Sequence, residues 1–443
     1  MLMMDVEGKK VLIVGLGASG LAAAELLAGK GAAVKITEAS DTAEIRKNLD
    51  RLSRYSVRSE IGGHTREFCK DADLVVTSPG VDAGSLPLAL AGESNIPVIG
   101  ELELGAGFCP APMIAVTGTN GKSTTTELIA RILTVSGKHA LACGNIGTPL
   151  SRVCGDLAGD SVAVVEVSSF QLETIKEFRP HIAVLLNISE DHYERHGGFD
   201  SYKAWKFRIF MNQGENDYSI VHSSFEGDTG LKGLKSKVIC FGPGREGLIG
   251  NVIKESEVPL KGEHNLDNVA ASILASRIMG IADPCIREGI MTFKGLPHRF
   301  ESIGVFGGVE VIDDSKATNI DATRRALESV RGKVVLIAGG RDKGGDYTAV
   351  LPLVKDKVKA MVLIGEAREK ITAVFSGAVA AYAAETMGEA VDRAFSLAGE
   401  GDVVMLSPMC SSFDMYSSYK ERGDVFQAEV RRVVQRTTDD KGF

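Results

Sequence analysis

Short apolar, β-branched runs alternate with longer stretches of helical periodicity along the whole chain. This alternation is typical of α/β folds built on largely parallel sheets. Ten runs predict strands, and they fall into three groups. The runs are residues 11–14, 34–37 and 74–77, then 114–116, 162–167 and 182–186, and finally 309–312, 334–338, 361–364 and 403–406.

Two stretches that contain glycine and proline separate the groups, at residues 105–112 and 295–298. A length of 443 residues also fits three domains of about 150 residues each. We therefore predict domains at 1–107, 108–297 and 298–443. The polar, Gly-rich stretch 223–250 is expected to be a loop or a short-strand excursion.

Composition narrows the class of protein. The net charge of -8 argues against nonspecific binding to nucleic acid or to membrane surfaces. The seven cysteines are scattered without a CxxC pair, which indicates reduced thiols in a cytoplasm. No signal peptide and no apolar run of roughly 18 residues is present, so we expect no membrane span. We predict a cytoplasmic protein without a nucleic-acid or membrane partner, acting as a monomer.

The strongest chemical signal is a GTNGKST segment between an apolar strand and a helical pattern. Glycines let the backbone wrap closely around phosphates, and the helix N-terminus adds positive potential. Lys122 would reach the terminal phosphates of ATP, and the Ser123 hydroxyl would join a magnesium shell. The spacing is GxxGK[ST], shorter than the standard phosphate loop, and a Gly-rich helix cap is the alternative interpretation. The predicted ATP loop comprises Gly118, Thr119, Asn120, Gly121, Lys122, Ser123 and Thr124.

A second glycine motif, GLGASG at residues 15–20, follows the first strand, and Glu38 closes the next strand. This is the pattern of a dinucleotide-binding fingerprint and favours a nicotinamide or flavin oxidoreductase as the rival hypothesis. A lone GxGxxG is weak evidence for a dinucleotide site, because the same turn can bind any diphosphate, including that of a nucleotide-sugar.

Further candidates lie just beyond predicted strands of the middle group. Glu166 ends one strand and His192 follows another, at the sheet edge where ligands of α/β proteins collect. Their donor atoms, with phosphate and water oxygens, suit Mg²⁺ or Mn²⁺. Taken singly, Glu166 fits a helix-capping acid, His192 a loop histidine and Lys206 a solvated surface lysine.

Several segments occur together in an order that resembles the Mur ligases, bacterial cytoplasmic enzymes that add amino acids to the peptidoglycan precursor. These segments are GTNGKST, EVSSFQLE (166–173), NISEDH (187–192) and GEHNLDN (262–268). GLPHRFE (295–301), DDSKATN (313–319) and SPMCSSFDMYSSYKERG (407–423) are similar to the branch that adds D-glutamate. The resemblance covers nearly the whole chain. It implies a Rossmann-like N-terminal domain that binds the UDP substrate, a central P-loop ATPase-like domain and a Rossmann-like C-terminal domain that binds the amino acid.

The resemblance also implies a reaction and its residues. ATP would phosphorylate the carboxylate of UDP-N-acetylmuramoyl-L-alanine, and the amine of D-glutamate would attack the acyl-phosphate. Lys122, His192 and a carbamylated Lys206 are implied as catalytic. The implied metal ligands are Ser123, Glu166, His192 and Lys206, and ATP would also contact Asn268, Arg299 and Asp314. The implied substrate contacts are Ser19, Glu38, Ser78, Pro79, Gly80 and Asn145 for the nucleotide-sugar, and Lys316, Thr318, Lys343, Ser412 and Tyr419 around D-glutamate.

Two positions depart from some relatives: Arg341 stands in place of an acid, next to Asp342, and Tyr419 in place of Phe. The choice of Lys206 over Lys203 depends on the Tyr-x-Ala-x-Lys spacing. Three alternatives stay open: a sister ligase that adds another amino acid or acts on folate, the oxidoreductase, and a nucleotide-sensing regulator without turnover. The C-terminal Ser-Ser-Phe-Asp segment and Lys343 favour an acidic incoming amino acid.

Overall fold

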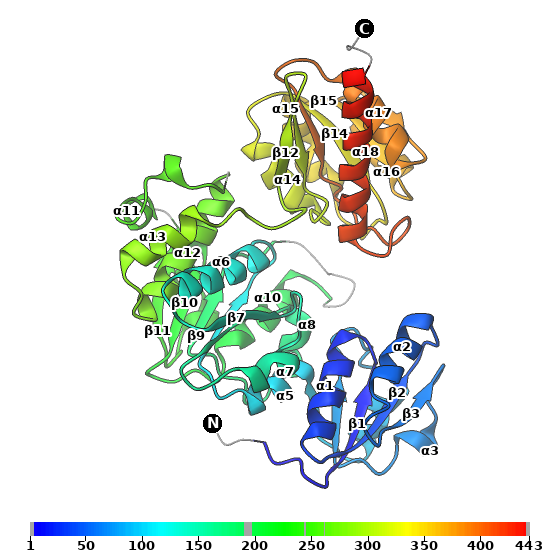
Figure 1. Cartoon of the computed structure of the whole chain (residues 1–443), viewed down its shortest axis with the longest axis vertical. Coiled ribbons are helices and arrows are strands. Elements are labelled where there is room, and N and C mark those ends of the chain that lie inside the picture. Colours follow the sequence, from blue (N-terminus) through cyan, green and yellow to red (C-terminus); the bar gives the residue numbers. More distant parts are fainter. Residues whose placement is uncertain (1–3, 190–196, 243–244, 261, 440–443) are drawn as a thin grey trace. The chain divides into compact units, whose positions relative to one another are not determined.

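The computed structural model describes residues 4–189, 197–242, 245–260 and 262–439. Their strands form three β-sheets with helices packed against them, as the strand pattern predicts. The predicted fold class of three α/β domains is confirmed. By contacts, the chain divides into two compact units. One holds the first two sheets, and the other holds the third sheet together with Ser189 and residues 258–260 and 262–266 (Figure 1). The exact limits 107/108 and 297/298 stay predictions.

The N-terminal sheet is entirely parallel, in the order β3-β2-β1-β4-β5. Alternate residues of its strands face opposite layers: Val11 and Ile13 pack toward α1, while Leu12 and Val14 pack toward α4. Its strands are β1 (Lys10–Val14), β2 (Ala33–Glu38), β3 (Arg58–Ile61), β4 (Leu74–Thr77) and β5 (Val98–Gly100). Its helices are α1 (Ala18–Gly29), α2 (Ala43–Arg51), α3 (Arg66–Cys69), α4 (Leu86–Glu93) and α5 (Glu101–Phe108).

The central sheet is also parallel, in the order β11-β10-β9-β6-β8-β7, so β6 lies in its middle. Its strands are β6 (Met113–Thr117), β7 (Ala140–Gly144), β8 (Val162–Glu166), β9 (Ile182–Leu185), β10 (Tyr218–His222) and β11 (Lys237–Phe241). Its helices are α6 (Lys122–Val135), α7 (Leu150–Val153), α8 (Ser169–Leu172), α10 (Phe199–Phe207), α11 (Arg245–Gly250), α12 (Glu263–Ile278) and α13 (Asp283–Met291). Short 3₁₀ turns are η1 (Cys154–Asp156), η2 (Arg208–Phe210), η3 (Ser223–Phe225), η4 (Thr229–Leu231) and η5 (Glu255–Glu257).

A buried acid joins the first two domains inside one unit. Glu103 in α5 is 3% exposed, and its carboxylate accepts hydrogen bonds from the backbone N–H groups of Lys176 (2.8 Å), Glu177 (2.8 Å) and Phe178 (3.0 Å). Three amide donors compensate the burial of the charge. The sequence offered no sign of this contact, because its partners lie more than 70 positions away.

The C-terminal sheet is mixed, in the order β12-β13-β17-β14-β15-β16, with β12 antiparallel and the other pairs parallel. Helices α14 to α16 cover one face and α17 and α18 the other. The strands are β12 (Glu301–Phe306), β13 (Val309–Asp313), β14 (Val334–Gly339), β15 (Val358–Ile364), β16 (Ala380–Ala383) and β17 (Val403–Leu406). The helices are α14 (Ile320–Ser329), η6 (Tyr347–Val350), α15 (Leu351–Lys357), α16 (Arg368–Phe375), α17 (Met387–Leu397) and α18 (Tyr419–Asp439).

All ten predicted strands are present, and β11 lies in stretch 223–250, where a loop or a short-strand excursion was expected. The described part of the chain also holds strands that were not predicted, namely β3, β5, β7, β10, β12 and β16. Most of these lie at or next to sheet edges, where half-exposed strands lack a continuous apolar run. Stretch 223–250 contains β11 and α11 besides its turns. Within the described residues, no helix has both the length and the apolar character needed to cross a membrane.

Candidate active site

The predicted phosphate loop leads from the carboxyl end of β6 into the first turn of α6. Gly121 caps this helix with a φ of 84°, a conformation that glycine adopts without strain. A Cβ at Gly121 would lie 2.3 Å from Asn268 Oδ1, so space as well as conformation requires glycine here. The loop therefore presents backbone amides at the N-terminus of a 14-residue helix, the arrangement that binds phosphate groups.

Asn187, at the carboxyl end of the neighbouring strand β9, holds this loop in place. Its side chain accepts a hydrogen bond from Asn120 N (2.9 Å) and donates one to Asn120 O (3.0 Å). Its backbone carbonyl accepts from Thr119 N (2.9 Å). Sequence reasoning quoted Asn187 only as the start of a motif and missed this role; its position just after an apolar strand was the available signal.

The side chains of Ser123 and Glu166, both predicted to bind magnesium, lie in direct contact. The Ser123 hydroxyl donates to Glu166 Oε2, and the Asn145 amide donates to Glu166 Oε1 at 2.7 Å. Ser123 and Glu166 are 2% and 3% exposed. Burial, and then the charge of Glu166, raises the pKa of Glu127 one turn further along α6, so two carboxyl groups interact here. This oxygen-rich, negatively charged set fits a hard divalent cation.

Two lysine ammonium groups share one carbonyl at the loop. Lys122 Nζ donates to Gly118 O and Thr119 O, both at 2.8 Å, and Lys206 Nζ donates to the same Gly118 O at 2.8 Å. Lys206 is 1% exposed and lies 4.6 Å from the centroid of the Tyr202 ring. The interpretation of Lys206 as a solvated surface lysine is therefore wrong, because helix α10 directs it inward at the phosphate loop.

The first glycine motif forms a tight turn at the carboxyl end of β1. A Cβ at Gly20 would lie 1.9 Å from Gly15 O, so α1 approaches the turn closely only because residue 20 is glycine. The Ser78 hydroxyl, after β4, donates to Gly15 O at 3.4 Å. Pro79 and Gly80 continue that loop, and Ser19 lies in the first turn of α1.

Glu38 ends the adjacent strand β2, and its side chain forms hydrogen bonds with backbone N–H groups. Its carboxylate accepts hydrogen bonds from Leu16 N (2.8 Å) and Ser40 N (2.9 Å). An acid at this place in a dinucleotide fold would instead bind ribose hydroxyls. Glu38 thus shapes the turn that the predicted nucleotide-sugar would contact.

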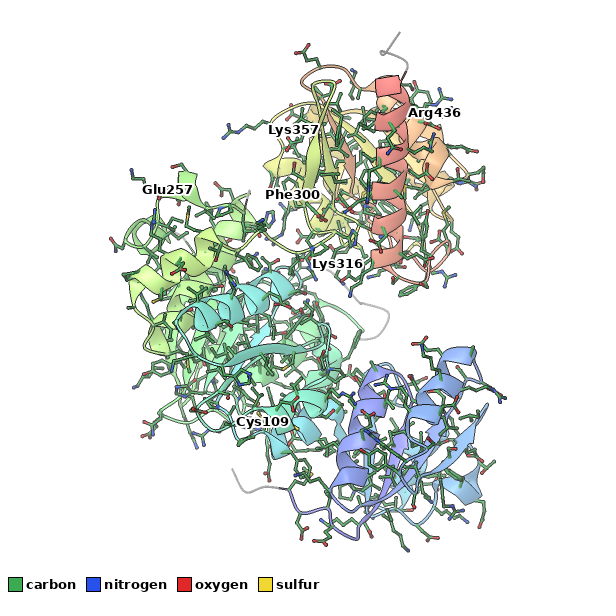
Figure 2. The ribbon with its side chains drawn as sticks, viewed as in Figure 1. Cys109, Glu257, Phe300, Lys316, Lys357 and Arg436 are labelled. Carbon is green, nitrogen blue, oxygen red and sulfur yellow. The ribbon has the colours of Figure 1, made fainter. Side chains whose placement is uncertain are left out.

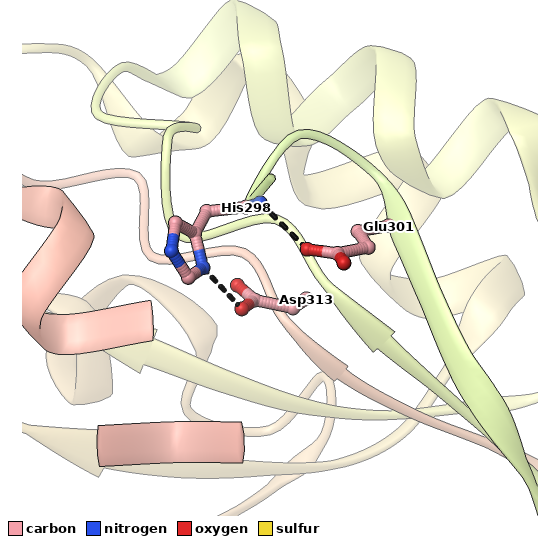
Figure 3. Close-up of side chains that lie close together, drawn as sticks. All are labelled: His298, Glu301 and Asp313. Carbon is pink, nitrogen blue, oxygen red and sulfur yellow. Dashed lines mark hydrogen bonds and ion pairs between the residues drawn. The ribbon is translucent and has the colours of Figure 1, made fainter. Parts of the chain in front are cut away.

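In the C-terminal domain, Arg299 lies on a strained turn. Its neighbours His298 and Phe300 have φ values of 61° and 47°, which non-glycine residues rarely adopt. The His298 ring hydrogen-bonds Asp313 at 2.7 Å, and its backbone N–H donates to Glu301 at 2.8 Å (Figure 3). The bond to Asp313 raises the pKa of His298. These three groups could in principle surround a metal ion, but hydrogen bonds already join them and account for the strained turn.

Asp314 follows β13 and lies beside this turn. Its carboxyl group accepts from Phe300 N (3.1 Å) and from the Ser407 hydroxyl (3.0 Å). Burial raises the pKa of Asp314 to about 7. Arg299 and Asp314 therefore lie in one local group, and their implied contact with ATP stays a prediction. Phe300 and Lys316 from the same region are labelled in Figure 2.

The two segments implied for D-glutamate are joined by a buried arginine. Lys316 Nζ lies 4.1 Å from the centroid of the Tyr419 ring. Arg422, 1% exposed, donates to Ser315 O (2.8 Å) and to Cys410 O (3.2 Å). Burial lowers the pKa of Arg422 to about 10. Sequence reasoning missed Arg422, although it lies in the quoted segment 407–423.

Lys343 lines a cavity of about 440 Å³. Ser189, Asp321, Arg324 and Tyr347 are among the other residues of its wall. Among the described residues, Lys316, Thr318, Ser412 and Tyr419 do not belong to this lining. Ser412 is 2% exposed, and the Thr318 backbone N–H donates to Lys316 O at 2.7 Å.

The remaining predicted site residues are Asn268, Thr124 and His192. Asn268 lies in α12 against Gly121, and Thr124 is buried in the first turn of α6. His192 lies outside the described residues. The structure thus brings the ATP loop, Ser123, Glu166, Lys206 and Asn145 together in one unit and Arg299, Asp314 and Lys343 in the other.

Comparison with known proteins gives full-length matches. Residues 9–100 match the Mur ligase MurD-like N-terminal domain, residues 116–276 the Mur ligase middle domain, and residues 298–410 the Mur ligase glutamate ligase domain. A protein of Desulfosudis oleivorans named UDP-N-acetylmuramoylalanine--D-glutamate ligase is 42% identical over 97% of this chain and 98% of its own. One of the same name from Koribacter versatilis is also 42% identical, over 98% and 99%.

Solved structures share the fold at lower identity. UDP-N-acetylmuramate-alanine ligase MurC of Thermotoga maritima has a TM-score of 0.60 and 19% identity, covering 96% of this chain and 100% of its own. The MurF ligase of Thermotoga maritima, solved in complex with ADP, has a TM-score of 0.60 and 16% identity, covering 90% and 95%. Three domain models match most of the chain, and relatives 42% identical cover nearly all of it, so the chain belongs to the Mur ligase family.

Proposed function

We propose that this protein is an ATP-dependent amide ligase that adds D-glutamate to UDP-N-acetylmuramoyl-L-alanine in cytoplasmic peptidoglycan precursor synthesis. The observation that carries the proposal is the contact of Ser123 with Glu166 beside Lys122, at a helix N-terminus. This group can hold a triphosphate together with a divalent cation. The amino acid and the nucleotide-sugar in this proposal come from the name of relatives that cover nearly the whole chain.

The chemistry needs an activated carboxyl group, since a free carboxylate is a poor acyl donor. A carboxylate oxygen of the muramoyl-alanine attacks the γ-phosphorus of ATP, and the bond to ADP breaks. The neutral amine of D-glutamate then attacks the acyl carbon, a proton leaves the nitrogen, and phosphate departs from the tetrahedral intermediate. The protein's task is to align these groups and to neutralise charge. Lys122 would turn from its two carbonyl partners to the terminal phosphates.

Mg²⁺ (or Mn²⁺) would be held by Ser123 and Glu166, whose oxygen atoms suit it, and it would neutralise charge on the transferring phosphoryl group. Asn145 keeps Glu166 oriented through its amide and is itself proposed to face the nucleotide-sugar. His192 and a carbamylated Lys206 are proposed as ligands of a second ion. A carbamate would replace the second buried cation beside Lys122 by an anion and so remove the repulsion between the two ammonium groups that share the Gly118 carbonyl.

The remaining substrate contacts are assigned to the two outer domains and to Asn268 of α12. Ser19, Glu38 and the Ser78–Pro79–Gly80 loop are proposed to hold the uridine diphosphate. Asn268, Arg299 and Asp314 are proposed to contact ATP. Lys316, Thr318, Lys343, Ser412 and Tyr419 are proposed to surround D-glutamate, with the ammonium groups pairing with its two carboxylates.

Phosphate release tests the proposal. The enzyme is supplied with ATP, Mg²⁺ and UDP-N-acetylmuramoyl-L-alanine, and D-glutamate, L-glutamate, meso-diaminopimelate and L-lysine are compared as acceptors. We expect release that depends on both the nucleotide-sugar and D-glutamate. Release with another acceptor would indicate a sister ligase, and no release with any acceptor would overturn the proposal.

A further inference from the structure

The turn that carries Lys343 is held by the preceding residue, Asp342. Asp342 Oδ1 accepts hydrogen bonds from Gly344 N (3.1 Å) and from the Tyr347 hydroxyl (2.9 Å). Asp342 Oδ2 accepts from Lys370 Nζ in α16 at 2.6 Å. Both carboxylate oxygens are thus used, and their donors come from the turn, from η6 and from α16.

The chain around Lys343 needs such support. Two glycines, Gly344 and Gly345, follow Lys343, and Gly344 has a φ of 75°. Glycine leaves a backbone free to take many conformations, so the bonds made by Asp342 help to fix the backbone that carries Lys343. Burial alone would raise the pKa of Asp342, but the bonds from Lys370, Tyr347 and Gly344 hold that pKa below its usual value. The carboxylate therefore stays charged while it anchors the turn.

Tyr347 links this anchor to the segment of Ser412. Its side chain is 2% exposed, and its hydroxyl lies 3.1 Å from Cys410 Sγ. Arg341 N also donates to Ser411 O at 2.9 Å, and Ser411 N to Arg341 O at 3.2 Å. Hydrogen bonds therefore tie the turn of Lys343 to the residues that directly precede Ser412.

We propose that Asp342 and Tyr347 are positioning residues that set the direction of Lys343 and thereby the affinity for the acidic amino acid. This inference rests on the proposed function, in which Lys343 binds a D-glutamate carboxylate. Charge pairing with a carboxylate depends on geometry, since a hydrogen bond weakens steeply when its donor is misdirected. Neither Asp342 nor Tyr347 needs to touch the substrate for this effect.

Kinetics of single variants test the inference. Asp342→Asn removes the charge that holds Lys370, and Tyr347→Phe removes one hydroxyl while it keeps the buried ring. We expect each to raise the KM for D-glutamate roughly tenfold, while the KM for ATP and kcat change by less than about twofold. Because both changes loosen the same anchor, the double variant should raise KM by less than the product of the single effects.

Asp402 provides a matched control in the same domain. Its carboxylate likewise accepts from a glycine N–H (Gly399, 2.8 Å) and from a lysine (Lys359 Nζ, 2.6 Å), but it precedes β17, at the opposite end of the strands from Lys343. Asp402→Asn should leave all KM values unchanged. A merely structural role of Asp342 would lower the melting temperature and the active fraction, and so would appear in kcat.

Lys343→Gln separates the inference from the function on which it rests. If Lys343→Gln raises the KM for D-glutamate but Asp342→Asn and Tyr347→Phe do not, the positioning role is wrong and the ligase assignment stands. If Lys343→Gln also leaves that KM unchanged, Lys343 does not bind the acidic substrate and the inference fails with that assignment. Phosphate release that depends on D-glutamate would still support the ligase itself.

Discussion

Replacing Gly121 by alanine puts a methyl group where the phosphate loop has no room for one. The new Cβ would lie 2.3 Å from Asn268 Oδ1, 3.1 Å from its Cγ and 3.2 Å from its Nδ2. Asn268 is 3% exposed, so it cannot move aside without disturbing its own neighbours. The variant therefore combines backbone strain with overpacking at the base of the ATP loop.

The two contributions can be estimated separately. A left-handed conformation costs an L residue about 1–2 kcal/mol, and overpacking a filled site typically costs about 1–3 kcal/mol more. Gly137 has a φ of 88° just beyond the other end of the same helix, and a Cβ there would meet nothing within 4 Å. Gly137→Ala should therefore show the strain alone, and Gly121→Ala both effects.

Urea unfolding followed by Trp205 fluorescence measures the difference. Trp205 is the single tryptophan of the chain and lies in α10 of the central domain. We expect Gly121→Ala to lower the free energy of unfolding by about 1–3 kcal/mol more than Gly137→Ala does. The KM for ATP should rise in Gly121→Ala and stay unchanged in Gly137→Ala.

Asn268→Ala completes the test, because it removes all three atoms that the new methyl group would meet. In that background the cost of Gly121→Ala should fall to the cost of Gly137→Ala. An equal cost of Gly121→Ala with and without Asn268 would refute the steric argument, and so would an equal cost at positions 121 and 137.

Three further predictions concern buried charges. Burial raises the pKa of Asp314 from 3.8 to about 7. The contribution of this carboxyl group to the free energy of unfolding is therefore full below about pH 4 and is lost as the pH rises through about 7. Asp314→Asn should flatten that part of the pH profile of unfolding; an unchanged slope would contradict the assignment. Lys206→Ala should lose ligase activity, and added acetate should partly restore it. Lys206→Arg cannot form the carbamate and should stay inactive with or without acetate. Full activity of either variant without acetate would contradict the carbamate proposal. Glu103→Gln should destabilise the protein by about 1.5–3 kcal/mol in urea unfolding, because three backbone amides lose a charged acceptor, and a loss below about 0.5 kcal/mol would contradict this.

Much of the candidate site could be predicted because its signals are local. A strand followed within six residues by two glycines, a lysine and a serine already predicts a phosphate-binding turn, and the structure has a glycine turn there at the N-terminus of α6. Glu166 was predictable for a related reason, since it ends a predicted strand of a parallel sheet. Asn145 follows β7, which was not predicted, and it was implied by the family resemblance alone. Such residues meet at one sheet edge whatever the length of chain between them.

Other features were out of reach of local reasoning. The inward direction of Lys206 depends on Gly118, 88 positions away, and a lysine after an aromatic residue reads equally well as a surface side chain. Arg422 bonds to Ser315, 107 positions away, and nothing in its neighbours distinguishes a buried arginine from an exposed one. The use of Glu38 by backbone amides, against its apparent match to a ribose-binding acid, belongs to the same class.

The amino-acid sequence by itself determined the layered α/β class, the places of the buried strands and the glycine turns, because hydrophobic periodicity and glycine's conformational freedom act over a few neighbouring residues. Only the tertiary structure decided which polar groups are buried and which partners they have there. A charge can leave water only where donors or acceptors from distant segments converge on it, and that convergence is a property of the packed sheets and helices.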